Sequence, residues 1–451
     1  MRKKIYALFS VLAIASMLLV ACGGGDTTSP GFVEGGSDFH TPTEPPTEEP
    51  DDGGAASEVP DLTGETITIY HFGDISGPYA AITGPLVNGS NDYVDYLNEN
   101  GGIFGAQIQL EFADTGGSVD EAVAAYERFT TEDDNVLAFI MYGSPEEEAL
   151  YERVAEDQIP VLAAGLSSTA FYGIPDGYMF GLGPIYPDQF GFFLDYIVAN
   201  WDDVKPEGAG DDINLALLSW PGAFGQGALT TESRAYAEEL GVNIVWEEQY
   251  DLSPSADTTA AILNAEAAGA NVIYTNTLAF GPAALLNGLN DLGLRSNFVV
   301  GGCNWAMDVG TFAFLNDPSY GVGFYAPFPF AWWQETDNPA IQLAQELFDK
   351  YERGPGEHNV GRLLIQGGLD LAKLALENAI LEVGFENLTG QDVYNALIQI
   401  ENYNVLNGLA TATYTNGQRS PNLMQLRQIQ GGPDAFNIIV DFSPASDLRP
   451  K

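Results

Sequence analysis

Short apolar runs alternate with segments of helical spacing along most of this chain, starting at Glu65. Residues 66–70 alternate as a half-buried strand does, and a loop rich in Gly, Ser and Pro follows over residues 73–84. Pro85 suits the first turn of a helix, which the Asn-Gly-Gly sequence of residues 100–102 ends. Because this alternation is typical of parallel sheets covered by helices, the sequence predicts an α/β fold.

The alternation continues in two separate runs. Further strands are predicted at residues 107–112, 136–142, 160–163, 213–219, 243–246, 272–275 and 298–300. Helices are predicted between them: Ser118 and Glu121 form a capping-box pattern, and Ser144 precedes acids that favour a helix start. The first run ends near Gly183 and the second begins near Ile213, which predicts two doubly wound lobes. Ligands then favour the carboxyl ends of the strands, where the following loops converge.

The start of the chain has the pattern of a secretory signal. A positively charged beginning is followed by an apolar run over residues 5–20, which is short for a membrane span. Residues 19–23 (Leu-Val-Ala-Cys-Gly) resemble the lipobox of bacterial lipoproteins, in which the cysteine, here Cys22, receives the lipid. We therefore expect residues 1–21 to be removed and the mature chain to be extracytoplasmic and lipid-anchored to the cell membrane. An ordinary signal peptide with an incidental cysteine is the alternative.

A tether is predicted between this anchor and the folded part. Residues 22–63 are rich in Gly, Pro, Thr, Glu and Asp, a composition that cannot offset the entropy of ordering. The prolines and acids favour an extended chain that holds the folded part away from the bilayer. Cys303 is the only other cysteine, so lipidation of Cys22 leaves no pair for an intramolecular disulfide.

The charge of the chain restricts its partners. The formal charge is -47, from 63 acidic and 16 basic residues. Such a surface repels phosphate backbones and anionic lipid headgroups, so nucleic acid is not expected as a partner. Attachment to the membrane therefore depends on the lipid at Cys22. The acidity fits a saline habitat and a strongly solvated extracellular surface equally well.

The sequence offers few groups for catalysis. Of its histidines, His40 lies in the predicted tether, His71 ends a strand and His358 lies in a polar loop. No Cys/His metal spacing, Gly-x-Ser-x-Gly elbow or His-Glu-x-x-His motif occurs. We therefore expect no enzyme activity, cofactor or metal. A surface hydrolase remains an alternative, because a pair of carboxylates brought together in space cannot be read from spacing.

Three segments carry a resemblance to a known family. They are the loop over residues 74–80 (Asp-Ile-Ser-Gly-Pro-Tyr-Ala), residues 98–105 (Asn-Glu-Asn-Gly-Gly-Ile-Phe-Gly), and strand 159–162 leading into residues 165–169 (Gly-Leu-Ser-Ser-Thr). In their order and spacing they resemble the leucine/isoleucine/valine-binding group of ABC-importer substrate-binding proteins, from about residue 65 to 443.

The resemblance implies the type I periplasmic-binding fold, in which the chain crosses between the lobes three times. The crossings fall near residues 183–187, 324–328 and 423–427. They divide the chain into two discontinuous lobes, an N-terminal lobe of residues 64–184 and 327–424 and a C-terminal lobe of residues 185–326 and 425–445.

The resemblance also implies a function. A small polar solute, such as an amino acid or amide, is expected to close a hinged cleft between the lobes. A membrane permease with a cytoplasmic ATPase is expected to recognise the closed form. A ligand-sensing lipoprotein that acts with a separate signalling partner is the alternative, because the same fold serves in sensors.

Candidate ligand contacts follow from the family's pattern. Family members hold the ligand carboxylate through loops that correspond here to Ser144 and to Ser167 and Ser168, and hydroxyls with helix-start N–H groups suit an anion. Ser144 is equally well explained as a helix N-cap, and the other two as a Ser-rich turn. Phe224 and Tyr79 are the expected aromatic contacts, with interlobe packing as the alternative for Tyr79.

The chain departs from the family's pattern after Val300. Amino-acid binders carry an acid there that pairs with the ligand ammonium, whereas this chain has Asn304 and Trp305, which suit an amide or a flat ligand. The acids that begin at Glu146 also disfavour an anionic group near that helix start. The specificity for amino acids is therefore open. Of the aromatic residues near the second crossing, Trp332 is the one we expect at the ligand, although core packing explains most of that run.

Overall fold

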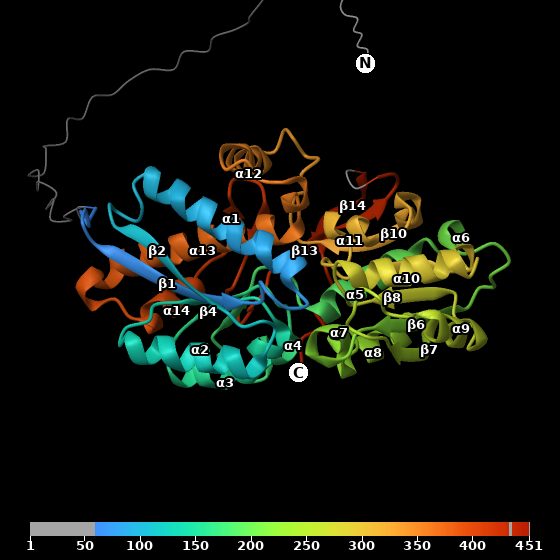
Figure 1. The fold of residues 1–451 in the computed structure, drawn as a ribbon. Coiled ribbons are helices and arrows are strands. Elements are labelled where there is room, and N and C mark those ends of the chain that lie inside the picture. Colours follow the sequence, from blue (N-terminus) through green and yellow to red (C-terminus); the bar gives the residue numbers. More distant parts are fainter. Residues whose placement is uncertain (1–58, 433–434, 451) are drawn as a thin grey trace, which may run out of the picture. The chain divides into compact units, whose positions relative to one another are not determined.

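The computed structural model describes residues 59–432 and 435–450. The predicted signal peptide, the lipid site Cys22 and the predicted tether up to residue 58 lie outside the described residues. Residues Ser57–Lys451 form one compact unit that contains two large sheets covered by helices (Figure 1). Within the described ranges, none of the helices is long and apolar enough to cross a membrane.

The first lobe is built on a five-stranded sheet in the order β2-β1-β3-β4-β5, in which all neighbours are parallel. Its strands are β1 (Thr66–Gly73), β2 (Gln107–Asp114), β3 (Phe139–Met141), β4 (Val161–Ala163) and β5 (Met179–Gly181). The strand order reverses at β1, because β2 lies on one side of it and β3 on the other. In doubly wound sheets this reversal opens a crevice at the carboxyl ends of the two strands.

The second lobe repeats this arrangement in a seven-stranded sheet in the order β14-β13-β10-β9-β8-β6-β7. Its strands are β6 (Ile213–Ser219), β7 (Val242–Gln249), β8 (Val272–Thr275), β9 (Val299–Gly302), β10 (Phe324–Phe328), β13 (Leu423–Ile429) and β14 (Phe436–Pro444). The strands from β7 to β10 are parallel and reverse their order at β6, whereas β13 and β14 are antiparallel additions. The predicted α/β class with two parallel-sheet lobes is confirmed.

Helices separate the strands in both lobes (Figure 1). The first lobe contains α1 (Ala80–Glu99), α2 (Val119–Glu132), α3 (Ser144–Glu156), α4 (Ser168–Tyr172), α12 (Pro339–Lys350), α13 (Val360–Val383), α14 (Gly390–Leu397) and the small hairpin β11 (Tyr403–Val405) with β12 (Ala410–Ala412). The second contains α5 (Tyr186–Ala199), α6 (Trp201–Val204), α7 (Gly222–Gln226), α8 (Thr231–Glu239), α9 (Thr259–Ala267), α10 (Phe280–Asp291) and α11 (Val309–Phe314).

The chain passes between the two sheets in three places. The first lies between β5 and α5, the second between β10 and α12, and the third between β12 and β13. Pro327 and Phe328 pair with Leu426 and Gln425, so the second and third passages lie outside these strands. The lobe boundaries predicted after residues 326 and 424 therefore fall inside strands, because the sequence does not show where an antiparallel pairing ends.

Helix α1 begins at Ala80, so the prediction that it starts at Pro85 was wrong. Pro85 lies inside the helix, where it removes one hydrogen bond to a carbonyl of the preceding turn. Burial of Ile82 and Leu86 compensates for this loss, since both lie against the backbone of α13 at Gly361. The prediction failed because a helix start rule weighs only local preference.

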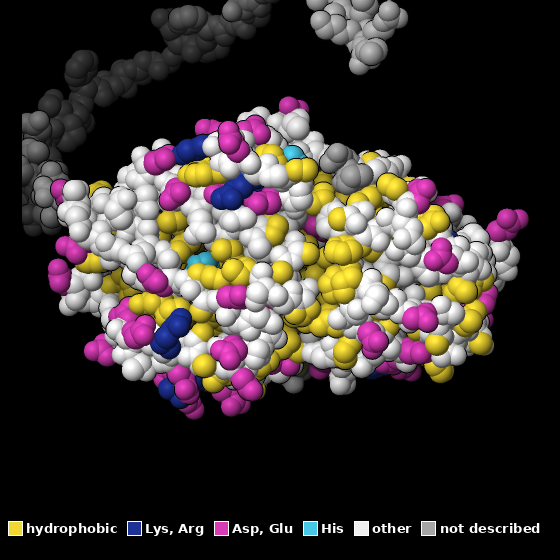
Figure 2. All heavy atoms as spheres, in the orientation of Figure 1, with side chains coloured by type: hydrophobic (Ala, Val, Ile, Leu, Met, Phe, Trp, Pro, Cys, Tyr) yellow, Lys and Arg dark blue, Asp and Glu magenta, His cyan; other side chains and the backbone are white. Residues whose placement is uncertain are grey.

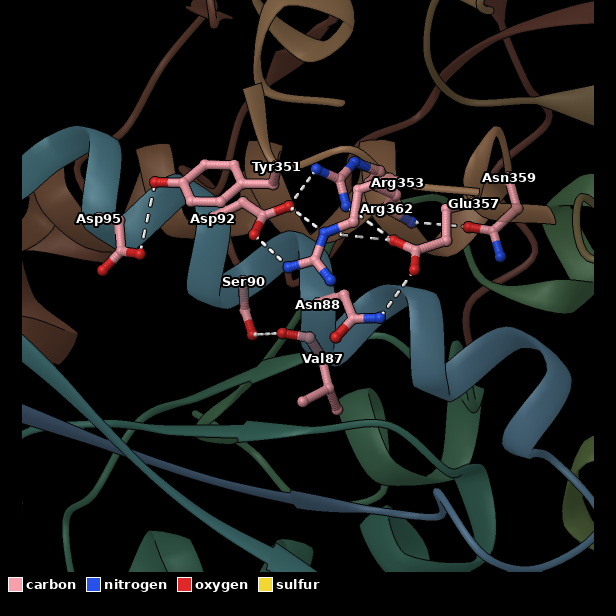
Figure 3. A network of polar contacts seen from close by, with 10 residues as sticks. All are labelled: Val87, Asn88, Ser90, Asp92, Asp95, Tyr351, Arg353, Glu357, Asn359 and Arg362. Carbon is pink, nitrogen blue, oxygen red and sulfur yellow. Dashed lines mark hydrogen bonds and ion pairs between the residues drawn. The ribbon is translucent and has the colours of Figure 1, made fainter. Parts of the chain in front are cut away.

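A buried charge network joins α1 to the segment that leads into α13 (Figure 3). The carboxylate of Asp92 accepts hydrogen bonds from the guanidinium groups of Arg353 and Arg362. Arg362 also donates to Glu357 Oε2 at 3.0 Å, and Asn88 donates to Glu357 Oε1 at 2.8 Å. Because Arg362 and Asp92 are almost fully buried, each charge depends on its partners for compensation.

Candidate functional site

A small cavity of about 50 Å³ lies between the two lobes. The described residues that line it are Asp74, Tyr79, Ile82, Thr83, Leu86, Gly117, Tyr142, Gly143, Ser144, Pro145, Glu146, Tyr186, Phe224, Leu278 and Trp305. In the first lobe they follow β1, β2 and β3, and in the second lobe they follow β6, β8 and β9, apart from Tyr186, which begins α5. The cavity therefore lies at the strand-order reversals of both sheets, where loops from parallel strands converge.

The carboxylate of Asp74 organises the loop between β1 and α1. Its Oδ1 accepts hydrogen bonds from the backbone N–H groups of Ser76, at 3.1 Å, and Gly77, and its Oδ2 accepts one from Tyr79 at 2.8 Å. A short polar side chain that satisfies its own loop in this way is a common turn device. The loop is thereby fixed so that the ring of Tyr79 faces the cavity.

Tyr142 lines the cavity from the end of β3 and depends on two neighbours. Its hydroxyl lies 2.7 Å from His71 Nδ1. Because burial lowers the pKa of His71 to about 3, the imidazole is neutral and can accept this hydrogen bond. A Cβ atom on Gly73 would lie 2.0 Å from the Tyr142 ring, so only glycine leaves room for the ring there.

The start of α3 brings polar groups to the cavity. Gly143 is the N-cap, and the Ser144 side chain makes no capping bond, so the N-cap alternative for Ser144 is not adopted. Glu146 Oε1 accepts a hydrogen bond of 2.8 Å from the Thr115 hydroxyl. Glu146 Oε2 is buried and has no hydrogen-bond partner within the described residues. Burial raises the pKa of Glu146 to about 7, an effect that the Thr115 hydroxyl partly offsets.

Glu147 lies directly behind this wall. It is fully buried, and a Cβ atom on Gly165 would lie 2.5 Å from its carboxylate oxygens. Burial and the neighbouring charge of Glu146 hold the pKa of Glu147 well above its usual range. Of these two acids, Glu146 is the one that lines the cavity.

Aromatic side chains from both lobes surround the cavity. Tyr79 of the first lobe lies edge-on to Trp220 of the second, with ring centroids 6.4 Å apart. The ring centroids of Phe224 and Tyr186 lie 5.4 Å apart. Trp305, which follows β9, completes the lining on the second-lobe side. An apolar or flat solute group would therefore be enclosed by rings from both lobes.

Of the eight ligand contacts expected from the sequence, the cavity brings together Tyr79, Ser144, Phe224 and Trp305. The other four do not line it. Their roles at the ligand stay predictions, and their observed surroundings are as follows.

Ser167 is the N-cap of α4, where its hydroxyl donates to Glu148 Oε1 at 2.6 Å and accepts from the Ala170 N–H at 3.4 Å. Ser168 is the buried first residue of the same helix. This arrangement matches the plain alternative of a Ser-rich turn.

Asn304 is buried next to Trp305, and its backbone N–H donates to Gln189 Oε1 at 2.9 Å. Its side-chain amide has no partner among the residues that the structure describes. Trp332 is buried in the aromatic core of the second lobe, stacked on Phe436 and edge-on to Phe328. Core packing therefore accounts for Trp332, as it was expected to do for most of that aromatic run.

Tyr142, Tyr186 and Glu146 line the cavity although they were not predicted from the sequence. Tyr142 and Glu146 flank the end of β3, and Tyr186 begins α5 after the first crossing. Their place in loops after strands was the available signal, but it does not distinguish lining residues from buried neighbours. Glu146 is buried and lines the cavity.

Comparison with known proteins identifies the family. A family model described as periplasmic binding protein matches residues 66–433. The chain belongs to the periplasmic binding protein family. The match covers both lobes, so the resemblance inferred from three short segments is confirmed. Members of this family are solute-binding proteins.

Individual relatives are more distant. The chain is 26% identical over 247 residues to the Leu/Ile/Val-binding protein homolog 3 of Brucella melitensis. This aligned region covers 52% of this chain and 61% of that protein. A branched-chain amino acid ABC transporter structure from Thermus thermophilus with bound valine has a TM-score of 0.73 at 22% identity, over 86% of this chain and 98% of that chain. A fatty acid ABC transporter substrate-binding protein from Thermomonospora curvata has a TM-score of 0.70 at 20% identity, over 86% and 95% of the two chains.

These solved structures share the fold with this chain, while their ligands differ. At this identity the likeness establishes the fold of the chain. No group of His, Cys, Asp and Glu residues suited to a metal ion occurs in the described part of the chain.

Proposed function

We propose that this chain is the extracytoplasmic solute-binding lipoprotein of an ABC importer. It captures a small polar molecule, such as an amino acid, an amide or a related compound, in the interlobe cavity and delivers it to a membrane permease driven by a cytoplasmic ATPase. The single observation that carries the proposal is the cavity at the strand-order reversals of both sheets, lined by side chains from both lobes.

A site divided between two lobes couples binding to closure. Tyr79 and Ser144 come from the first lobe, and Phe224 and Trp305 from the second, so a solute that touches all four binds the closed arrangement better than an open one. A ligand shifts a conformational equilibrium only by its difference in affinity between the two states. The passages between the lobes are the places where the hinge motion is proposed to occur. The closed form is then the signal that the permease recognises.

The anchor is part of the same proposal. Cys22 would carry the lipid, and residues 22–63 would act as the tether, of which residues 59–63 are described. Within that short stretch the Leu62 N–H donates to the Phe104 carbonyl oxygen at 2.8 Å, so the folded part already begins there. A lipid-anchored chain stays near its permease, which raises the effective concentration of loaded protein at the membrane.

A thermal-shift screen tests solute capture. The mature chain would be melted with amino acids, amides and sugars, because a solute that binds only the folded state raises the melting temperature. Trp305→Ala should lose the rise given by any solute that binds the wild type. Trp246→Ala is the matched control, since Trp246 is a half-exposed residue of β7 outside the cavity.

A solute-dependent rise that Trp246→Ala keeps and Trp305→Ala loses would support capture in this cavity. Equal loss in both variants, or no rise with any compound for a folded chain, would contradict the proposal.

A further inference from the structure

We propose that the solute is an organic amine without a carboxylate, whose ammonium group binds Glu146 Oε2 while its apolar body lies against the rings of Tyr79, Phe224 and Trp305. The inference rests on the proposed function, because it names the solute class of the same cavity. Four features of the site lead to it.

The cavity contains acids and lacks bases. Asp74 and Glu146 line it, whereas none of the described residues in its lining is Lys, Arg or His. A carboxylate inside the cavity would find no cation to pair with and two carboxyl groups in its way. Removing an ionised carboxylate from water without a partner is strongly unfavourable. A cationic group would instead be attracted by these carboxyl groups.

Asp74 and Glu146 differ in how many of their carboxylate oxygens already accept hydrogen bonds. Both oxygens of Asp74 accept backbone N–H groups of the loop that follows β1. Glu146 Oε1 accepts the Thr115 hydroxyl, and the backbone N–H groups of Tyr142 and Gly143 act on the carboxylate to lower its pKa, but Oε2 has no hydrogen-bond partner among the described residues. Glu146 is only 5% exposed, so bulk water does not satisfy this atom. Buried polar atoms in native proteins are nearly always paired, which makes Oε2 the atom that a solute donor would complete.

The rest of the lining suits the body of an amine. Tyr79, Tyr142, Tyr186, Phe224 and Trp305 present rings, and Leu278 and Ile82 present aliphatic surface. Aromatic ring faces cover apolar groups and also attract cations. This wall therefore suits the apolar body of an amine and favours its ammonium group over a carboxylate.

The surface charge favours the same class of solute. The formal charge is -47, and Asp and Glu are spread over the visible face with few Lys or Arg side chains between them (Figure 2). A strongly negative protein raises the local concentration of cations and the rate at which they associate. It does the opposite for organic anions.

Matched probes separate the two charged groups of a solute. 3-Methylbutylamine, leucine and 4-methylpentanoate share one branched chain and carry, in turn, the ammonium alone, both groups and the carboxylate alone. Phenethylamine, phenylalanine and 3-phenylpropionate do the same for an aromatic body. Isothermal titration of the mature chain with all six probes is the measurement, supported by thermal shift.

Binding by at least one amine, at least tenfold tighter than by its amino acid and its acid, is the expected result. Glu146→Gln should weaken that binding at least tenfold, because it keeps an oxygen for the Thr115 hydroxyl and removes the charge. Glu121→Gln is the matched control, since Glu121 is an exposed first-turn acid of α2, and it should bind the amine as the wild type does. The melting temperature of each variant without solute shows whether the fold is kept.

Other outcomes would overturn the inference in distinguishable ways. If an amino acid or a carboxylic acid binds and neither amine does, the amine assignment is wrong, while solute capture is still supported. Amine binding that Glu146→Gln does not weaken would remove the role of Glu146. Silence of all six probes would overturn the amine assignment, and silence in the wider screen of the proposed function as well would overturn solute capture.

Discussion

The Asp308 carboxylate joins the two lobes, because its Oδ2 accepts a hydrogen bond of 2.7 Å from the backbone N–H of Val360. Asp308 precedes α11 in the second lobe, and Val360 is the first residue of α13 in the first lobe. The other oxygen of Asp308 accepts the Gly310 N–H at 2.7 Å. One buried carboxylate thus caps the starts of two helices that belong to different lobes, where an anion is favoured by both helix dipoles.

This contact gives stability a pH dependence that can be attributed to one residue. Burial raises the pKa of Asp308 to about 7, although the N–H groups of Gly310 and Val360 act against the rise. A folded-state pKa above the unfolded value means that the native chain binds more protons between about pH 4 and 7, so this group's contribution to the unfolding free energy falls as the pH rises through that window.

Asp308→Asn should remove that contribution. The difference in unfolding free energy between wild type and variant, measured by urea unfolding at pH 5 and pH 7.5, should change by on the order of 1 kcal/mol or more, with the wild type losing more on going to pH 7.5. Other buried acids, such as Asp188 with a pKa of about 7, contribute equally to both chains and cancel in the difference. Parallel pH dependences in the two proteins would contradict the assignment.

Removal of the buried charge of Asp92 should strongly destabilise the fold. Asp92→Asn takes away the partner shared by Arg353 and Arg362 and leaves Arg362 buried with Glu357 alone. Breaking a buried pair in this way destabilises by about 3–5 kcal/mol, which chemical denaturation would show. Asp95→Asn is the control, because the contact that Asp95 makes to Tyr351 is an exposed hydrogen bond of 3.3 Å, and its loss should cost less than about 1 kcal/mol. Similar losses in the two variants would mean that the buried network is not specially stabilising.

Gly73→Ala tests the fit of Tyr142 beside the cavity. The added Cβ would meet the Tyr142 ring at 2.0 Å, so the ring or the strand must shift, at a cost of about 1–3 kcal/mol. Gly210→Ala is the matched control, since Gly210 is exposed and no atom lies within 4 Å of its added Cβ, and alanine should change the unfolding free energy there by less than about 0.5 kcal/mol. Midpoints of urea unfolding give both values. A harmless Gly73→Ala would show that Tyr142 moves freely, and solute binding should then be unaffected as well.

Amine binding should strengthen as the pH rises through about 7. Glu146 must be ionised to pair with an ammonium, and burial raises its pKa to about 7. The charged and titratable groups that face it are Asp74, Glu147, Tyr79 and Tyr142, of which Asp74 also acts to raise its pKa. Below pH 7 the affinity should fall by up to about tenfold per pH unit, as one proton must leave for each amine bound. Titrations at pH 6, 7 and 8 measure this, and a pH-independent affinity in the wild type would contradict it.

Strand positions could be read from the sequence because each strand carries its own apolar pattern. Residues 213–219 and 272–275 were predicted with the bounds that β6 and β8 have. The start of α1 could not be read this way, since Pro85 lies inside a helix whose Ile82 and Leu86 are buried against α13. The place of Trp332 was also beyond the sequence, because an aromatic residue beside a crossing can enter either the cleft or the core.

The sequence by itself determined the α/β class, the presence of two lobes and the loops that meet at their strand ends, because periodicity and turn residues are local properties of the chain. Only the tertiary structure decided that Glu146 points into the cavity with a free oxygen while Glu147 lies buried behind it. Adjacent residues on a helix start differ in orientation by about 100°, and which of them faces a cavity depends on what the other lobe and the next loop place around them. The sequence therefore determined that acids lie near the site, and the fold decided which of them faces the cavity.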